Sequence, residues 1–227
     1  MPGFLFLIEL GFLLACLFFM PRAKRVLQST YPYHVTLRSI NKMPFEMKMG
    51  QMWKASSQLL NHCSQSFSVQ IHSFVLMPNH YHMIVRTPLA NISTFMCYFN
   101  RELSREIGYE TGRINQKFGA RYHSSIIGSL IYYRTVYRYV YRNPVAASIC
   151  RRAEVYPYST LPCLLGWESA GFPIFDTQFE HIQDWRYQLA WLNEPCTTEE
   201  VNKIKYGLKK VHFSLEVPGT SRETSQI

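Results

Sequence analysis

Apolar and polar positions alternate along residues 33–38, a stretch rich in β-forming residues, and this pattern predicts a strand. Two further stretches of the same character cover residues 67–77 and 80–85. Pro78 and Asn79 stand alone between these two stretches, and a pair of this kind indicates a turn. We therefore expect a first strand and, later in the chain, a β-hairpin.

Apolar residues recur at helical spacing in residues 45–62, from Asn91 or Ser93 to residue 107, and in residues 129–142. A further extended stretch, 118–127, precedes the last of these helices. The order is strand, helix, strand, strand, helix, strand, followed by a helix. This order predicts an α+β fold of the ferredoxin-like type, an antiparallel βαββαβ sheet with helices on one face.

Proline 144 is expected to end or kink the helix predicted at residues 129–142, because the residue before a proline disfavours the helical conformation. Beyond residue 165 the pattern predicts a helical C-terminal extension, with helices at 176–192 and 197–210. The second of them begins with the capping sequence Thr197-x-x-Glu200. Residues 217–227 are polar and predicted to be disordered.

Residues 3–20 are almost entirely apolar, with Glu9 in the middle and basic residues only after the segment. The segment is marginal in length for a membrane span, and the missing basic residues before it weaken the interpretation as a signal peptide. The alternative to a membrane anchor is that the natural start is Met20 and that the start of this sequence is assigned upstream of it. On that hypothesis a chain that begins at Met20 folds and works as well as the full chain. The predicted organisation is thus an apolar segment 1–20, a domain 21–165 and an extension 166–227.

Composition favours a polyanionic partner. The chain has 24 Lys and Arg against 15 Asp and Glu, a formal net charge of +9, and aromatic residues make up 15% of it. Aromatic rings beside basic residues suit single-stranded nucleic acid, because bases stack on the rings while cations follow the phosphates. The six cysteines form no C-x-x-C pair, which leaves zinc-ribbon and thioredoxin-like classes without support and favours reduced thiols in the cytoplasm.

His80 and His82 flank Tyr81 on the third predicted strand. Side chains alternate along a strand, so the two imidazoles point to the same face and can converge on one metal ion. A His-x-His pair by itself is weak evidence and is more typical of two surface or core histidines. The apolar residues on both sides of the pair place it on a central strand, where polar groups without partners are costly.

Tyr139 and Asn143 lie four residues apart in the last predicted helix, so they share one face. A phenol with a pKa near 10 is a poor nucleophile unless it is activated or the phosphate it attacks is polarised. A divalent metal supplies that polarisation, and an amide oxygen together with imidazoles suits Mg²⁺ or Mn²⁺. The neighbouring Tyr133, Tyr137 and Tyr141 are interpreted as packing residues.

Three segments of the chain resemble the REP-associated tyrosine transposases, relatives of the insertion-sequence 200/605 transposases among the HUH single-tyrosine nucleases. They are YHVTLR (33–38), FVLMPNHYHMIVRTP (74–88) and YRYVYRNPVAA (137–147). The resemblance covers about residues 21–165, and the combination of MPNHYH with a downstream YVYRNPV is specific. The apolar segment 1–20 has no counterpart in the family pattern.

The resemblance implies a ferredoxin-like catalytic domain that nicks and joins single-stranded DNA beside short imperfect hairpins. It implies a metal bound by His80 and His82 and completed by the polar residue at position 143. It also implies that Tyr139 is the nucleophile, with a 5′-phosphotyrosine link and a free 3′-hydroxyl as products. No small-molecule cofactor is expected, and the protein could be a monomer or a homodimer.

Three more residues are candidates for DNA contacts: Arg38 at the end of the first strand, and Arg121 and His123 before the last helix. A solvated surface explains Arg121 and His123 equally well, and the lysines of 203–210 are better explained that way. The main alternative to a transposase is a non-catalytic protein that binds single-stranded nucleic-acid hairpins on the same fold. A membrane-associated protein is a third possibility that rests on residues 3–20 alone.

Overall fold

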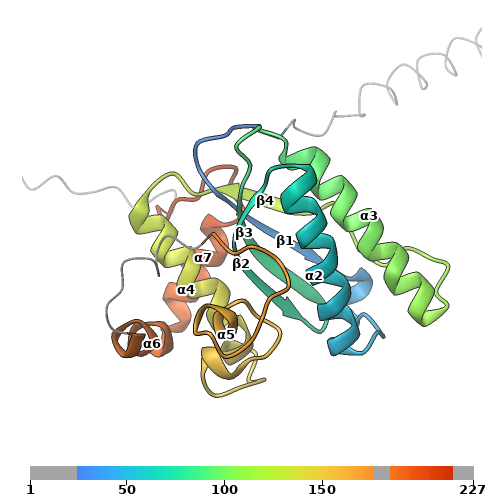
Figure 1. Ribbon diagram of the computed structural model, residues 1–227. Helices are drawn as coiled ribbons and strands as arrows, with labels where there is room; N and C mark the ends of the chain where they lie inside the picture. The colour runs from blue at the N-terminus through green and yellow to red at the C-terminus, as the bar shows by residue number, and fades with distance from the viewer. Residues whose placement is uncertain (1–24, 176–184, 217–227) are drawn as a thin grey trace, which may run out of the picture.

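The computed structural model describes residues 25–175 and 185–216 (Figure 1). The apolar segment 1–20 and the polar tail 217–227 lie outside the described residues, as does the first half of the helix predicted at 176–192. No helix of the described part is long and apolar enough to cross a membrane. The five cysteines of that part are all free thiols.

A four-stranded antiparallel sheet forms the centre of the molecule, with the order β2-β3-β1-β4. Its strands are β1 (Tyr33–Arg38), β2 (Gln70–Met77), β3 (His80–Arg86) and β4 (His123–Ile126). β2 and β3 form the predicted hairpin around the turn at residues 78–79. This is the predicted βαββαβ arrangement of a ferredoxin-like fold.

Two helices, α2 (Met49–Ser66) and α3 (Ile92–Thr111), cover one face of the sheet (Figure 1). α2 begins at residue 49, so the prediction of a start at residue 45 is wrong. Phe45 is instead buried in the core, its backbone N–H donates to the Pro78 carbonyl, and Glu46 has a positive φ of 63°. A tertiary contact therefore holds the residue that looked like the first apolar position of the helix.

The opposite face of the sheet carries the helices α4 (Leu130–Ala146), α6 (Trp185–Asn193) and α7 (Thr198–Gly207). The helices of the βαββαβ unit thus lie on one face, as predicted, while the following helix and the C-terminal extension pack on the other. α7 starts with the predicted capping box, because Thr197 and Glu200 each bond the backbone of the other. Two apolar cores result, one on each side of the sheet.

Helix α4 continues through Pro144 and ends at Ala146, so of the two predicted alternatives, an end or a kink at Pro144, the end is wrong. A proline has no N–H to donate to the carbonyl four residues earlier, here that of Val140. The side-chain Nδ2 of Asn143 donates to this carbonyl at 3.3 Å and to the Tyr139 carbonyl at 2.8 Å. The asparagine therefore supplies the donor that the proline lacks, and the last turn remains helical.

The last predicted strand is shorter than expected, since β4 occupies only residues 123–126 of the stretch 118–127. Phe118 forms an isolated bridge with Ser39, and the N–H of Gly119 donates to the carbonyl of Arg38. This part of the stretch extends the pairing with β1 beyond its end, and an irregular turn separates it from β4.

Both outer strands of the sheet are covered by later segments of the same chain. On β2, the N–H of Leu76 donates to Tyr158 and the N–H of Thr160 donates to Phe74, both at 2.9 Å. The residues that cover β2, 158–160, lie between two short helical turns, η2 (Ala153–Val155) and α5 (Leu161–Leu164). A third such turn, η1 (Ile40–Lys42), follows β1.

On β4, residues 211–213 of the C-terminal extension take the outer position. The N–H of Ile126 donates to Val211 and the N–H of Phe213 donates to Ile126, both at 2.8 Å. The extension thus belongs to the same folded unit as the sheet.

Candidate functional site

Three histidines meet on the face of the sheet that α4 covers. His80 and His82 point to the same side of β3, as their spacing predicted, and their ring centroids are 5.0 Å apart. β1 pairs with β3 so that Thr36 lies opposite His82. His34 is two residues before Thr36 on the same side of β1, and its ring lies beside that of His82. Nε2 of His34 is 2.9 Å from Nδ1 of His82, and the two rings stack with centroids 5.2 Å apart.

The hydrogen bonds of the histidines leave one ring nitrogen of His80 and one of His82 free to bind a metal ion. Nδ1 of His80 lies 2.6 Å from Oδ1 of Asn79. An amide oxygen can only accept, so Nδ1 of His80 is the donor, and the lone pair of a neutral His80 is on Nε2. In His82 the nitrogen Nδ1 is occupied by His34, which leaves Nε2.

All three rings are neutral at neutral pH because burial disfavours the charged imidazolium. Burial, and then the positive charge of Arg38, lower the pKa of His80 to about 4. Burial, and then His123, lower the pKa of His34 to about 3. Burial is also the main reason why the pKa of His82 lies well below its usual value. Neutral imidazoles with free lone pairs are the form that binds a metal ion.

Tyr139 of α4 faces this group of histidines. Its ring centroid is 5.7 Å from that of His82 and 6.3 Å from that of His34, in both cases edge to face. Burial raises the pKa of the phenol, and Arg38 opposes this shift only in part. The hydroxyl therefore keeps its proton at neutral pH and needs help from its surroundings to act as a nucleophile.

Asn143 lies one helical turn beyond Tyr139 and lines the same groove. Its Nδ2 is occupied by the two backbone carbonyls of α4, which fixes the amide group. Within the described part of the chain its Oδ1 makes no hydrogen bond. Tyr133, Tyr137 and Tyr141 are buried on the other sides of the helix and pack in the second core, as predicted.

These residues line a groove of about 1600 Å³ between the sheet, α4 and α7. Among the described residues, Glu200 is the only acidic one that lines the groove, and nine cationic ones line it. The cationic residues are Arg38, Lys42, Arg121, Arg134, Arg138, Arg142, Lys203, Lys205 and Lys209. A groove with this excess of positive charge concentrates and holds polyanions such as a phosphodiester chain.

The predicted site residues come together in this groove: His80, His82, Tyr139 and Asn143 all line it. Arg38, Arg121 and His123 line it as well. Nε2 of His123 lies 2.6 Å from the carbonyl oxygen of Leu208 and donates to it, so this side chain contacts the C-terminal extension.

Among the described residues, no three His, Cys, Asp or Glu side chains are grouped so that they could hold a metal ion by themselves. The candidate metal ligands are two imidazoles and one amide oxygen. An asparagine is not among those four residue types, so this set is not such a group.

Sequence reasoning missed His34 and three arginines of α4. Alternation along β1 put His34 and Thr36 on one side, but only the pairing of β1 with β3 reveals that this side is the one that carries His82. Arg134, Arg138 and Arg142 are spaced four apart and form a stripe on α4 next to Tyr139. That spacing was visible in the sequence and would have indicated the basic side of the groove.

Two comparisons with known proteins concern the family and the fold of this chain. The sequence profile of the family described as "Transposase IS200 like" matches residues 28–143, about half of the chain, and this stretch contains all four candidate catalytic and metal-binding residues. No curated protein matches the chain significantly.

A solved structure described as the REP-associated tyrosine transposase bound to a REP hairpin is similar to this one, with a TM-score of 0.53 and 18% sequence identity. The match covers 70% of this chain and 94% of the other. At this level of identity the likeness establishes the shared fold.

Proposed function

The chain belongs to the IS200-like transposase family, and on that premise we propose that it cleaves and rejoins single-stranded DNA next to a hairpin, with Tyr139 as the nucleophile. One observation carries the proposal. Tyr139 of α4 is partly buried and stands edge-on to the neutral rings of His82 on β3 and His34 on β1, inside a groove that His80 and cationic side chains also line.

The histidine pair and Asn143 fit a divalent metal ion. Nε2 of His80 and Nε2 of His82 are the free nitrogens of rings held by their other nitrogen, and Oδ1 of Asn143 is a hard oxygen donor on a fixed amide. Mg²⁺ or Mn²⁺ bound there would polarise the scissile phosphate as a Lewis acid.

His34 sets the geometry of this pair. If His82 offers Nε2 as a ligand, its proton is on Nδ1 and is donated to Nε2 of His34 at 2.9 Å. A hydrogen bond from the second nitrogen of a metal-binding histidine fixes its tautomer and its ring orientation. We assign this positioning role to His34, whose ring is buried and neutral.

The covalent step follows from the position of Tyr139. Its oxygen attacks the phosphorus, a bond between phenol oxygen and phosphorus forms, and the bond between phosphorus and the 3′ oxygen breaks. The phenol releases its proton and the departing 3′ oxygen takes one up, so the products are a 5′-phosphotyrosine and a 3′-hydroxyl. Attack of a 3′-hydroxyl on the phosphotyrosine reverses the step and joins two strands.

The cationic groove supplies the affinity for DNA in this scheme. Arg38 lies at the end of β1, next to His80 in the register of the sheet, where it can contact the phosphate that Tyr139 attacks. Arg121 lines the groove further out. The similar solved structure holds a REP hairpin, and we propose a DNA hairpin with single-stranded flanks as the substrate class here.

Cleavage of a labelled hairpin oligonucleotide tests the proposal. The purified protein, the oligonucleotide and Mn²⁺ are incubated and resolved on a denaturing gel, where a covalent adduct migrates more slowly than free DNA. We expect an adduct with the wild-type chain, none after addition of EDTA, and none with His80→Ala or His82→Ala, while both variants still bind the hairpin. Full cleavage by the double variant would refute the metal site, and binding without any cleavage by the wild-type chain would favour the hairpin-binding alternative.

A further inference from the structure

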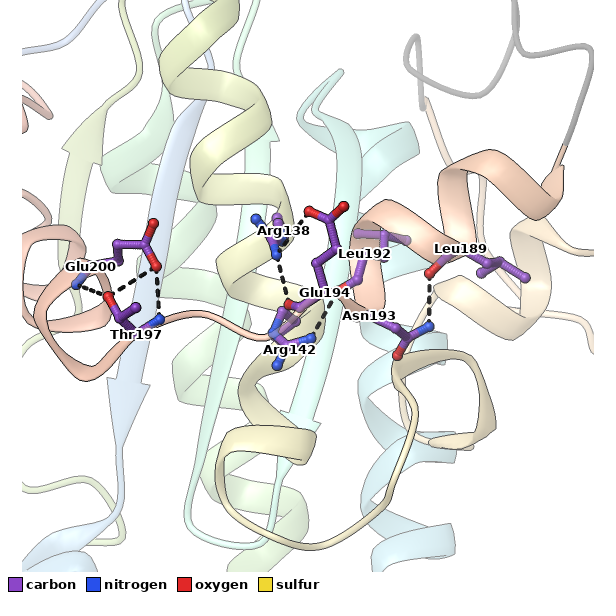
Figure 2. A network of polar contacts seen from close by, with 8 residues as sticks. All are labelled: Arg138, Arg142, Leu189, Leu192, Asn193, Glu194, Thr197 and Glu200. Carbon is purple, nitrogen blue, oxygen red and sulfur yellow. Dashed lines mark hydrogen bonds and ion pairs between the residues drawn. The ribbon is translucent and has the colours of Figure 1, made fainter.

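The C-terminal extension is fastened directly to the helix that carries Tyr139. Nη2 of Arg138 donates to the backbone carbonyl of Glu194 at 2.6 Å and lies 3.5 Å from its carboxylate. Nη1 of Arg142 donates to the carbonyl of Leu192 at 3.2 Å. Figure 2 shows both arginines reaching from α4 to the end of α6. Two of the basic residues beside the nucleophile therefore hold the extension in place.

The start of α7 is fixed by its own capping box. The N–H of Thr197 donates to the Glu200 carboxylate at 2.7 Å, and the N–H of Glu200 donates to the Thr197 hydroxyl at 3.2 Å (Figure 2). Reciprocal capping satisfies two backbone donors at once and defines the residue at which a helix begins. Only a few residues separate this cap from the arginine contacts at the end of α6.

The other end of α7 is anchored to the sheet. His123 of β4 donates to the Leu208 carbonyl, and the following residues 211–213 pair with Ile126. Gly207 packs so closely on the Phe213 ring that a Cβ there would lie 2.9 Å from it. Helix α7 is thus held at both ends, and its position relative to Tyr139 is determined by the fold.

Three lysines of the extension, Lys203, Lys205 and Lys209, line the groove that contains the histidines. Lys203 forms a pair with Glu199 at 2.8 Å, so its charge is partly balanced. Lys205 and Lys209 have no ion-pair partner within the described part of the chain.

We infer that α7 is the second wall of a DNA-binding groove, and that Lys205 and Lys209 bind phosphates of the single-stranded segment that leads to Tyr139. This inference rests on the function proposed above and gives a role to the C-terminal extension. Cations on a helix surface usually serve as a solvated face. Here they line the groove of the nucleophile, on a helix fixed at both ends, and without carboxylates to balance them.

Salt-dependent binding tests the inference with two oligonucleotides. One is a hairpin with single-stranded flanks on both sides, and the other is the same hairpin without flanks. Each phosphate contact to a single strand contributes about 0.7 to the slope of log affinity against log salt. In the variant Lys205→Gln/Lys209→Gln we expect the slope for the flanked hairpin to fall by about 1.4, and the affinity near 0.1 M salt to fall by about 25-fold. The hairpin without flanks should bind as well as it does to the wild-type chain.

A matched control removes the same charge elsewhere. Lys54 lies on α2, across the sheet from the groove, and Lys210 contacts the carbonyl of Glu216 and does not line the groove. The variant Lys54→Gln/Lys210→Gln should keep both the slope and the affinity for the flanked hairpin. Thermal melting of all variants should coincide, because the four side chains make no buried contact.

Two results would overturn the inference. One is an unchanged slope in the Lys205→Gln/Lys209→Gln variant, and the other is an equal loss of affinity on both oligonucleotides, which would place these lysines on the hairpin. The proposed function is tested by a different measurement, the formation of the Tyr139 adduct by the wild-type chain. A wild-type chain that binds the flanked hairpin without forming an adduct contradicts the catalytic proposal, while the lysine comparison still decides the role of α7.

Discussion

The two faces of the sheet bury different sets of side chains. On the face covered by α2 and α3, the core consists mainly of aliphatic and phenyl side chains, among them Phe95, Phe99 and Leu103, which are completely buried, and it also contains the tyrosines Tyr33, Tyr81 and Tyr122. On the face covered by α4, the buried side chains include three tyrosines of that helix together with His34 and His82. Buried tyrosines thus occur on both faces, whereas the buried imidazoles of the described residues, His34, His72 and His82, lie on the second.

Several buried polar groups on the α4 face have specific partners. Tyr141 lies with its hydroxyl 2.8 Å from that of Thr160, Nδ1 of His72 is 3.0 Å from the Tyr133 hydroxyl, and Tyr156 donates to the Leu76 carbonyl at 2.7 Å. Buried polar groups stabilise little by themselves and cost free energy when they lose a partner. The difference between the faces indicates that one face mainly stabilises the fold and the other holds reactive groups in defined positions.

The largest expected effect comes from Tyr139→Phe on the reactive face. This change removes one oxygen and almost no volume, so folding and DNA binding should persist while the covalent adduct disappears. The matched controls are Tyr137→Phe and Tyr141→Phe, which should keep the adduct. Mass spectrometry of the trapped adduct checks the assignment, and a nucleotide attached to either control tyrosine would contradict it.

Phe99→Ala on the opposite face should have the reverse outcome. The ring is fully buried and packs edge to face on Tyr81 and Phe74 at centroid distances of 5.7 Å and 6.4 Å. Its removal leaves a cavity, and we expect the free energy of unfolding to fall by about 3–5 kcal/mol. Urea denaturation measures this loss. At urea concentrations well below the unfolding midpoint of the Phe99→Ala variant, the folded variant should still form the adduct. A loss of adduct without a loss of stability would show that the two faces are not separated in this way.

Replacing His34 tests how the reactive face is organised. In His34→Gln the amide oxygen can still accept the proton from Nδ1 of His82, whereas in His34→Leu it cannot. We expect Mn²⁺ affinity without DNA to fall by about 10- to 100-fold in the leucine variant and by clearly less in the glutamine variant. Calorimetric titration with Mn²⁺ measures both values. Equal affinities of wild type and His34→Leu would remove His34 from the positioning role.

The smallest expected effect is a pH dependence of stability that belongs to the α4 face. Burial, and then Arg86, lower the pKa of His72 from 6.5 to about 4. The folded state therefore binds fewer protons than the unfolded state between these values, and stability is complete above about pH 6.5 and lost as the pH falls. From about pH 7.5 to about pH 5, His72 should account for a loss of about 2 kcal/mol.

Denaturation curves at the two pH values, recorded for wild type and for His72→Gln, isolate this contribution. The glutamine variant should lose less stability on acidification than the wild-type chain. Replacement of the exposed His62 by alanine should leave the difference unchanged. An identical pH dependence in wild type and His72→Gln would contradict the prediction.

Local periodicity was sufficient to predict the strands of the sheet and which of the candidate site residues share a face. His80 and His82 share a face because side chains alternate on any strand, and Tyr139 and Asn143 share one because a helix repeats every 3.6 residues. The pairing of His34 with His82 depends on the register between β1 and β3, which no local pattern contains. The same holds for Lys205, whose position results from contacts of α6 and α7 with α4 and β4.

Errors at element boundaries have the same origin. Phe45 fits a helical pattern, yet its contact with Pro78 keeps it outside α2. Pro144 signals a helix end, yet the side chain of Asn143 replaces the missing donor and α4 continues. In both cases a contact that sequence spacing does not encode outweighs the intrinsic preference of the residue.

The way in which the sheet ends has a consequence for synthesis of the protein. An uncovered outer strand exposes unpaired N–H and C=O groups that can recruit a strand from another molecule and start aggregation. Here residues 158–160 occupy the outer side of β2, and residues 211–213 occupy that of β4. During translation β2 is protected early, whereas β4 stays open until the extension has left the ribosome. Residues 211–213 therefore remove the exposed edge of β4 once the C-terminal extension has folded onto the sheet.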